Sequence, residues 1–152
     1  MGNFFRGRSL PAHNRRQGDR YRAENRQRPG VVETATGLQY EVLHQGDGPK
    51  PEVLHLLTVH YRGTLINGVE FDSSYGRGVP LDIHLYEVIP GWREGMVLMP
   101  VGSRYRFVIP PELAYGNRKM GLLLGPESTL IFDVELLNAE KEKRNTECKQ
   151  LI

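Results

Sequence analysis

The chain has 152 residues, of which 39% are hydrophobic and 25% charged, with one cysteine, Cys148. This length suits one domain with a core plus an appendage, and the single cysteine excludes an internal disulfide framework and a cysteine-based zinc site. No stretch approaches the roughly 20 apolar residues of a membrane span, and the N-terminus has no apolar signal-peptide region. The sequence therefore predicts a cytoplasmic protein, with a periplasmic protein whose leader has been removed as the alternative.

The N-terminal segment is strongly basic. Residues 1–28 hold eight arginines against two acidic residues, which gives this segment about +6 while the whole chain carries +2. It shows no sustained apolar periodicity, and a short helix over "RYRAENRQR" is the only regular element predicted before Pro29 and Gly30. We expect residues 1–36 to form a flexible or partly helical arm, of which residues 1–28 contribute nothing to turnover of small peptides. A solubilising role is favoured over nucleic-acid binding, because the arm has few aromatic residues for stacking on bases.

Residues 37–140 have the texture of a strand-rich domain. Short segments alternate between apolar and polar residues, as expected of half-buried strands, and Asn67-Gly68 is a strong hairpin signal between two of them. The expected strands are "LQYEVLH" (38–44), "LLTVHYRGTL" (56–65), "VEFD" (69–72), "PLDIHL" (80–85), "RYRFVI" (104–109) and "TLIFDVELL" (129–137).

The segment "GWREGMVLM" (91–99) follows a different pattern. Trp92 and Met96 lie four residues apart, as on one face of a helix, and Pro90 suits the first turn of that helix. Because a sheet must bury one of its faces, this short helix is the expected cover. The sequence thus predicts an α+β domain over residues 37–140, followed by a charged tail over 141–152.

Reactive chemistry is sparse in this sequence. It has no glycine-rich phosphate-binding motif, and its serines lack the setting of a nucleophile elbow. His55 and His60 fall on opposite faces of a strand, which is poor geometry for one metal ion. We therefore predict no metal and no cofactor.

Three long segments, in order, carry a family resemblance: "VHYRGTLINGVEFDSSYGRGVP", "EVIPGWREGMVLMPVGSRYRFVIPPELAYG" and "STLIFDVELL". They resemble the FKBP-type peptidyl-prolyl cis-trans isomerases (EC 5.2.1.8), and "ENRQRPGVVETATGLQYEVLHQGDG" resembles the lead-in to the isomerase domain of bacterial Mip-like members. The resemblance implies an FKBP-like fold, a curved antiparallel β-sheet wrapped around one short α-helix. It also implies an enzyme that isomerises X-Pro bonds by desolvation and hydrogen bonding in an apolar aromatic pocket, assisting protein folding. The alternative is a peptide-binding chaperone module with little turnover.

The resemblance also implies roles for particular residues. Asp72, Tyr115 and the backbone N–H of Ile89 would be catalytic. The residues expected to bind substrate are Tyr61, Phe71, Leu81, Val88, Trp92, Met120, Leu123, Leu124 and Phe132. Two plainer interpretations stay open, since the aromatic residues could be ordinary core and Asp72 could simply cap a turn. Leu81 stands where many members have an aromatic residue, and "GNRKMGLLLGPE" departs from the loop common in relatives.

The expected partners are proline-containing polypeptides, with FK506-like macrocycles as inhibitors. No membrane partner is expected, because no stretch approaches the length of a membrane span. The N-terminal arm is far shorter than the helical dimerisation region of Mip-like proteins, so we expect a monomer.

Overall fold

The structure is a computed structural model that describes residues 3–141, with side chains described from Leu10 onward. Cys148 and all but the first residue of the predicted charged tail lie outside the described residues. The elements in chain order are α1 (Asn3–Arg26), β1 (Val31–Glu33), β2 (Gln39–His44), β3 (His55–Leu65), β4 (Glu70–Ser73), α2 (Ser74–Arg77), β5 (Leu81–His84), the 3₁₀ turn η1 (Leu85–Glu87), α3 (Pro90–Met96), β6 (Arg104–Ile109), the 3₁₀ turn η2 (Pro111–Leu113) and β7 (Leu130–Lys141).

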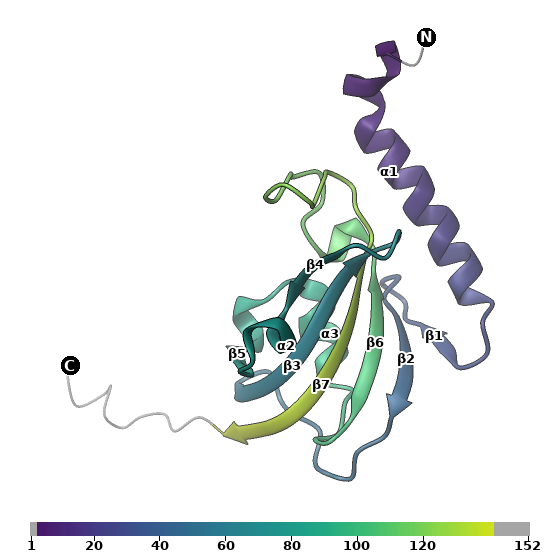
Figure 1. Ribbon diagram of the computed structural model, residues 1–152. Coiled ribbons are helices and arrows are strands. Elements are labelled where there is room, and N and C mark those ends of the chain that lie inside the picture. The colour runs from purple at the N-terminus through teal and green to yellow at the C-terminus, as the bar shows by residue number, and fades with distance from the viewer. Residues whose placement is uncertain (1–2, 142–152) are drawn as a thin grey trace, which may run out of the picture.

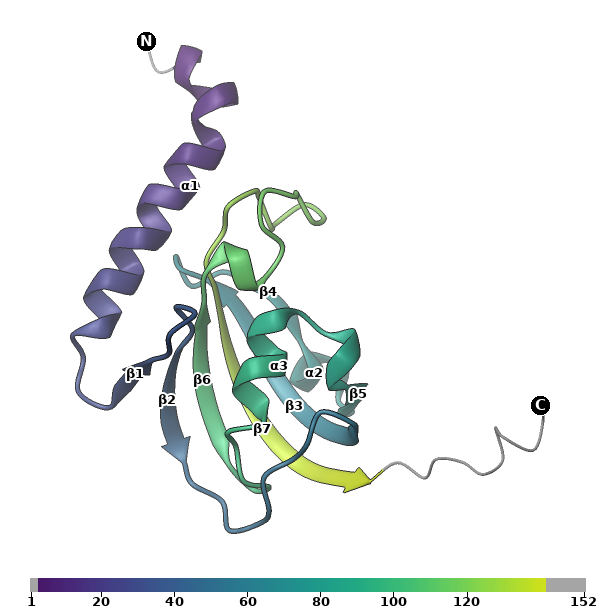
Figure 2. The same cartoon turned by 180° about the vertical axis from the view of Figure 1, so that it is seen from behind.

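One antiparallel sheet of seven strands forms the domain. The strand order is β1-β2-β6-β7-β3-β4, and β5 pairs with the first half of β3 beside β4. The longest ladder joins β3 to β7, from His55 opposite Lys141 to Leu65 opposite Leu130. The strands curve around α3, which lies against one face of the sheet (Figures 1 and 2). The predicted α+β architecture, a curved antiparallel sheet around one short helix, is confirmed.

Helix α3 packs very closely on the sheet. Trp92 and Met96 are both buried in the core, as their spacing predicted. A Cβ added at Gly91 would lie 2.6 Å from Cγ2 of Ile109, and one added at Gly95 would lie 2.5 Å from Cε1 of Phe107. Since real Cβ atoms do not approach other atoms this closely, the two glycines allow the α3 backbone to rest directly on β6.

The N-terminal helix is much longer than the short one predicted. Helix α1 runs through Pro11 to Arg26, and it lies alongside the domain (Figure 1). Its inner face is polar: Asn25 Nδ2 donates to Gln39 Oε1 at 2.8 Å, and Gln39 Nε2 donates to the Arg22 carbonyl at 2.8 Å. Arg22 and Asn25 are both buried. A search for apolar periodicity could not find this helix, because hydrogen bonds and ion pairs hold it to the domain.

Candidate active site

Four aromatic side chains from four elements meet on the side of the sheet that faces α3. Tyr61 comes from β3, Phe71 from β4, Trp92 from α3 and Phe132 from β7. The ring centroids are 5.3 Å apart for Tyr61–Trp92, 5.2 Å for Trp92–Phe132 and 5.5 Å for Phe71–Phe132, all near-perpendicular. Edge-to-face packing is a favoured arrangement of aromatic rings. Sequence positions far apart thus form one aromatic cluster.

Trp92 has an unusual position in this cluster. Its side chain is only 5% exposed, yet its Nε1–H has no hydrogen-bond partner among residues 3–141. Buried donors are nearly always paired, and leaving one unpaired costs about 1–3 kcal/mol. The unpaired donor therefore favours a binding role for Trp92.

Asp72 lies at the edge of the cluster in a network of three donors. The Tyr61 hydroxyl donates to Asp72 Oδ2 at 2.6 Å, and Arg77 Nη1 and the Ser73 N–H donate to Oδ1, each at 2.9 Å. Burial opposes ionisation, but these hydrogen bonds prevail and lower the pKa of Asp72. Burial and the adjacent carboxylate raise the pKa of Tyr61. Asp72 is thus ionised and Tyr61 neutral near pH 7.

The sequence analysis missed Arg77. Arg77 is the last residue of the four-residue helix α2, and besides its hydrogen bond to Asp72 its Nη2 also donates to the Tyr61 hydroxyl at 3.0 Å. The side chain that caps α2 is Ser73, which accepts a hydrogen bond from the Gly76 N–H. The plainer interpretation had allowed Asp72 to cap this turn. The residue that caps α2 is Ser73 instead.

Val88 and Ile89 precede α3 in an extended conformation. Arg93 fixes this segment, because its Nη2 donates to the Val88 carbonyl at 3.2 Å and its Nε donates to the Leu85 carbonyl at 3.2 Å. The Ile89 carbonyl accepts from the N–H groups of Trp92 and Arg93. The Ile89 N–H itself has no acceptor within the described part of the chain. It is free to donate to a bound molecule.

The long loop before β7 carries the other predicted residues. Tyr115 is partly buried against the core, and its hydroxyl has no acceptor among the described residues. Met120 and Leu124 form a bridge in which the Met120 N–H donates to the Leu124 carbonyl at 2.8 Å. The two predicted lip leucines differ in burial, since Leu124 is buried in the core and Leu123 is exposed.

Two further apolar residues, Leu81 and Leu122, differ in burial. Leu81 lies opposite Val59 in the β3–β5 pairing and is partly buried against the core. Leu122, which the sequence analysis did not single out, is 96% exposed. No sequence pattern distinguishes it from its two leucine neighbours, because their orientations depend on the Met120–Leu124 bridge.

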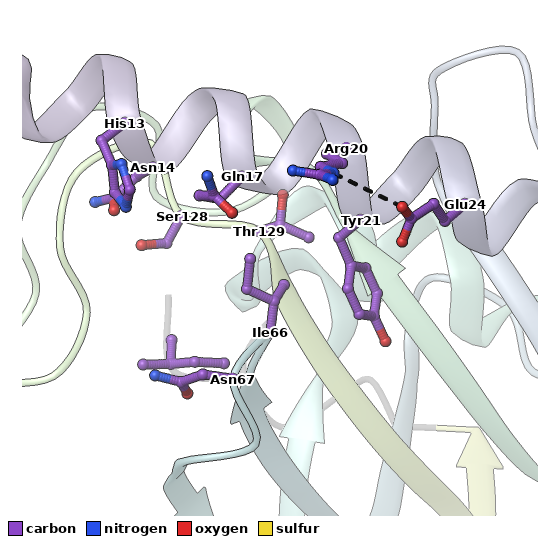
Figure 3. Close-up of a pocket in the computed structure, with 11 residues that line it drawn as sticks. His13, Asn14, Gln17, Arg20, Tyr21, Glu24, Ile66, Asn67, Ser128 and Thr129 are labelled. Atoms are coloured by element: carbon purple, nitrogen blue, oxygen red, sulfur yellow. Dashed lines mark ion pairs between the residues drawn. The ribbon is translucent and has the colours of Figure 1, made fainter.

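A cavity of about 580 Å³ lies away from the aromatic cluster, between α1 and the end of β3 (Figure 3). None of the predicted site residues lines it. Arg20 and Glu24 of α1, which line it, form an ion pair of 3.7 Å. Its remaining lining residues are His13, Asn14, Gln17, Tyr21, Leu65, Ile66, Asn67, Ser128 and Thr129.

Residues 3–141 contain no group of three or more His, Cys, Asp or Glu side chains that could hold a metal ion. Among the helices of the same range, none has both the length and the apolar character needed to cross a membrane.

Comparison with known proteins gives two family matches. A family model described as FKBP-type peptidyl-prolyl cis-trans isomerase matches residues 48–137. A second, described as the domain amino terminal to FKBP-type peptidyl-prolyl isomerase, matches residues 7–42. The second match includes most of α1 and all of β1, which the sequence analysis had assigned to an arm.

Individual relatives agree with these matches. The FKBP-type peptidyl-prolyl cis-trans isomerase FkpA of Aeromonas hydrophila is 48% identical over 128 residues, which cover 84% of this chain and 47% of that protein. Outer membrane protein MIP of Legionella longbeachae is 42% identical over 128 residues, covering 84% and 55%. The crystal structure of FkpA from Escherichia coli superposes with a TM-score of 0.82 at 45% identity, covering 86% of this chain and 61% of that one. The chain spans about half the length of the curated relatives it matches.

Proposed function

The chain belongs to the family of FKBP-type peptidyl-prolyl cis-trans isomerases, and we propose that it accelerates the isomerisation of X-Pro bonds in polypeptides and so assists folding. The observation that carries the proposal is the aromatic cluster with an ionised carboxylate at its edge and unpaired donors around it.

Rotation about an X-Pro bond faces a barrier of about 18–20 kcal/mol, because it breaks amide resonance. The twisted amide has lost its resonance and carries less charge on its carbonyl oxygen than the planar amide. An apolar surface that removes water from the amide therefore favours the twisted form, which is differential binding of the transition state. Trp92 would form the floor beneath the proline ring, with Tyr61, Phe71 and Phe132 as walls. No proton transfer is needed.

Hydrogen bonds would hold the peptide on this surface. The Ile89 N–H and the Tyr115 hydroxyl would each donate to a substrate carbonyl, since neither has an acceptor among residues 3–141. Asp72 is held ionised by Tyr61 and Arg77, so it would act as a fixed charge that orients the peptide. Charges and dipoles that are in place before the reaction need no reorganisation during it.

A protease-coupled assay on short X-Pro peptides tests the proposal. We expect acceleration over the uncatalysed rate, with a preference for an apolar residue before proline because of the leucines around the site. Trp92→Leu should lower kcat/KM at least tenfold. Tyr75→Phe is the control, because Tyr75 stacks on His60 outside the cluster. An uncatalysed rate with the folded wild-type chain would overturn the proposal.

The peptide-binding chaperone alternative has one specific observation in its favour. Met120, Leu122 and Leu123 place exposed apolar side chains on one loop, a surface suited to unfolded polypeptide. Suppression of aggregation of an unfolded protein without proline turnover would support this alternative. Loss of that suppression on Leu122→Ser, with peptide turnover unchanged, would assign the two activities to separate surfaces.

Further proposals concern ligands and location. FK506-like macrocycles should bind on Trp92, the only indole of the chain, and quench its fluorescence.

The name of the Legionella relative, outer membrane protein MIP, supports the periplasmic alternative over the cytoplasmic prediction. A monomer stays a prediction, which sedimentation equilibrium would test.

Nucleic-acid binding is disfavoured by the pairing of the N-terminal arginines. Five of the eight arginines in residues 1–28 pair with acidic side chains, with Arg15 on Glu112 and Glu127, Arg20 on Glu24, Arg22 on Asp19, Arg26 on Glu33 and Arg28 on Glu41. The charge of these five arginines is already compensated within the protein, which reduces the charge available to displace counterions from a phosphate backbone.

A further inference from the structure

Arg15 of α1 contacts both ends of the loop that carries Tyr115. Its Nη1 and Nη2 donate to the two carboxylate oxygens of Glu112 at 3.3 and 3.1 Å, and Nη2 also donates to Glu127 Oε1 at 2.8 Å. Glu112 lies three residues before Tyr115, and Glu127 lies three residues before β7. One guanidinium group therefore joins the two legs of the loop, and its paired donors match the fork geometry of a carboxylate.

Glu127 has an unusual backbone conformation. It is the only non-glycine residue with a positive φ, 60°, among residues 3–141. This left-handed conformation is unfavourable for a residue with a Cβ and persists only where its surroundings hold it. It lets the Glu127 N–H donate to the Gly116 carbonyl at 2.7 Å, which closes the loop directly beside Tyr115. Arg15 is the side chain that holds the Glu127 carboxylate.

Other contacts of α1 reach the same part of the loop. Asn14 Nδ2 donates to the Pro126 carbonyl at 2.8 Å, and Arg22 Nε donates to Thr129 Oγ1 at 3.2 Å. Figure 1 shows α1 running beside this loop, which lies at the end of the domain nearest the helix. Burial alone would raise the pKa of Glu112, but the hydrogen bond and charge of Arg15 lower it, so the pair is ionised at neutral pH.

We propose that Arg15 is a positioning residue, which holds the loop by joining Glu112 to Glu127 and so sets the positions of Tyr115 and Leu124 for peptide binding. The proposal rests on the isomerase function proposed above. It makes the docking of α1 and the binding of peptide thermodynamically coupled, so that each strengthens the other. It also opposes the expectation that the N-terminal arm does not contribute to turnover of small peptides.

Arg15→Ala in the full chain tests the proposal, with Arg16→Ala as the matched control. Arg16 is exposed on the same helix and carries the same charge. Arg15 is 33% exposed, and such ion pairs are individually weak, so we expect KM to rise about three- to fivefold with kcat within about twofold. Arg15→Lys should fall between, since lysine keeps the charge but not the paired donors. Arg16→Ala should match the wild type.

Two further measurements separate positioning from general stability. The amide of Glu127 should exchange its hydrogen at least tenfold faster in Arg15→Ala, while amides of the β3–β7 ladder keep their protection. Glu127→Gly supplies the left-handed conformation without strain, so the Arg15→Ala effect on KM should shrink in that background. A wild-type KM in Arg15→Ala overturns the proposal, as does faster exchange at Glu127 without a change in KM.

The outcome is distinguishable from failure of the isomerase function. If the wild-type chain shows no turnover, peptide affinity can still be measured by Trp92 fluorescence, and the coupling predicts a weaker affinity in Arg15→Ala than in Arg16→Ala. Equal affinities in the two variants would overturn the positioning role whatever the turnover.

Discussion

Gly63 offers the sharpest test of the aromatic cluster. It lies in β3 directly opposite Phe132 of β7. A Cβ added there would lie 2.7 Å from Cζ of Phe71 and 2.8 Å from Cε1 of Phe132. Its φ is not in the left-handed range, so the backbone accepts alanine and the substitution acts through this collision alone.

The size of the effect follows from these distances. Carbon atoms rest about 3.5–4.0 Å apart, so each ring must retreat by roughly 1 Å in Gly63→Ala. Overpacking of this kind lowers the free energy of unfolding by about 1–3 kcal/mol. A 1 Å displacement of site groups can reduce a rate by up to about 100-fold. Because the walls bind but do not react, we expect a loss of about tenfold in kcat/KM, equivalent to about 1.4 kcal/mol.

The assay is peptide turnover at a temperature where both proteins are folded, with urea unfolding measured in parallel. Gly76→Ala is the control, because its added Cβ meets nothing nearer than the Ser73 Cβ at 4.0 Å. It should leave both quantities unchanged. A folded Gly63→Ala protein with wild-type kcat/KM would refute the reasoning, since Phe71 and Phe132 could then not shape the site.

Three other predictions test the polar groups. Tyr115→Phe keeps the ring and removes one neutral hydrogen bond, so kcat/KM should fall about three- to tenfold; an unchanged value would remove Tyr115 from the site. Peptide turnover should be nearly flat from about pH 6 to 9, because the pKa of Asp72 is lowered and that of Tyr61 is raised; a bell-shaped profile would indicate acid–base catalysis instead. Folding lowers the pKa values of Glu33 and Glu112, so the stability that these carboxylates give the folded protein is complete above their ordinary pKa of 4.5 and is lost as pH falls through the lower folded values. The urea midpoint of unfolding should therefore drop in that pH range, and a constant midpoint would contradict this prediction.

The sheet and its helix were predictable because apolar periodicity reports burial. The alternation of Leu130, Phe132, Val134 and Leu136 places all four in the core, and the four-residue spacing of Trp92 and Met96 identifies the helix that covers them. These patterns are local, so one segment of sequence is enough to find each of them.

The contacts of α1 could not be predicted in the same way. Arg15 and Glu112 are 97 residues apart in the sequence, and neither has a neighbour pattern that indicates the other. The basic composition of the arm suggested a solvated tail, whereas Arg15 and Arg28 pair with acidic residues of the domain. Arg77 was missed for a similar reason, because its contact with Asp72 depends on the turn made by α2.

The distribution of unpaired groups indicates how catalysis would work. The acceptor at the edge of the cluster, Asp72, is already bonded to three donors. The groups without partners among residues 3–141 include three donors: the Ile89 N–H, the Trp92 Nε1–H and the Tyr115 hydroxyl. A donor bonded to the carbonyl of the rotating amide would stabilise the planar form, where that oxygen carries more charge, and would slow the reaction. The donors would therefore bind neighbouring carbonyls of the peptide, while the aromatic faces would meet the rotating bond and keep water from it.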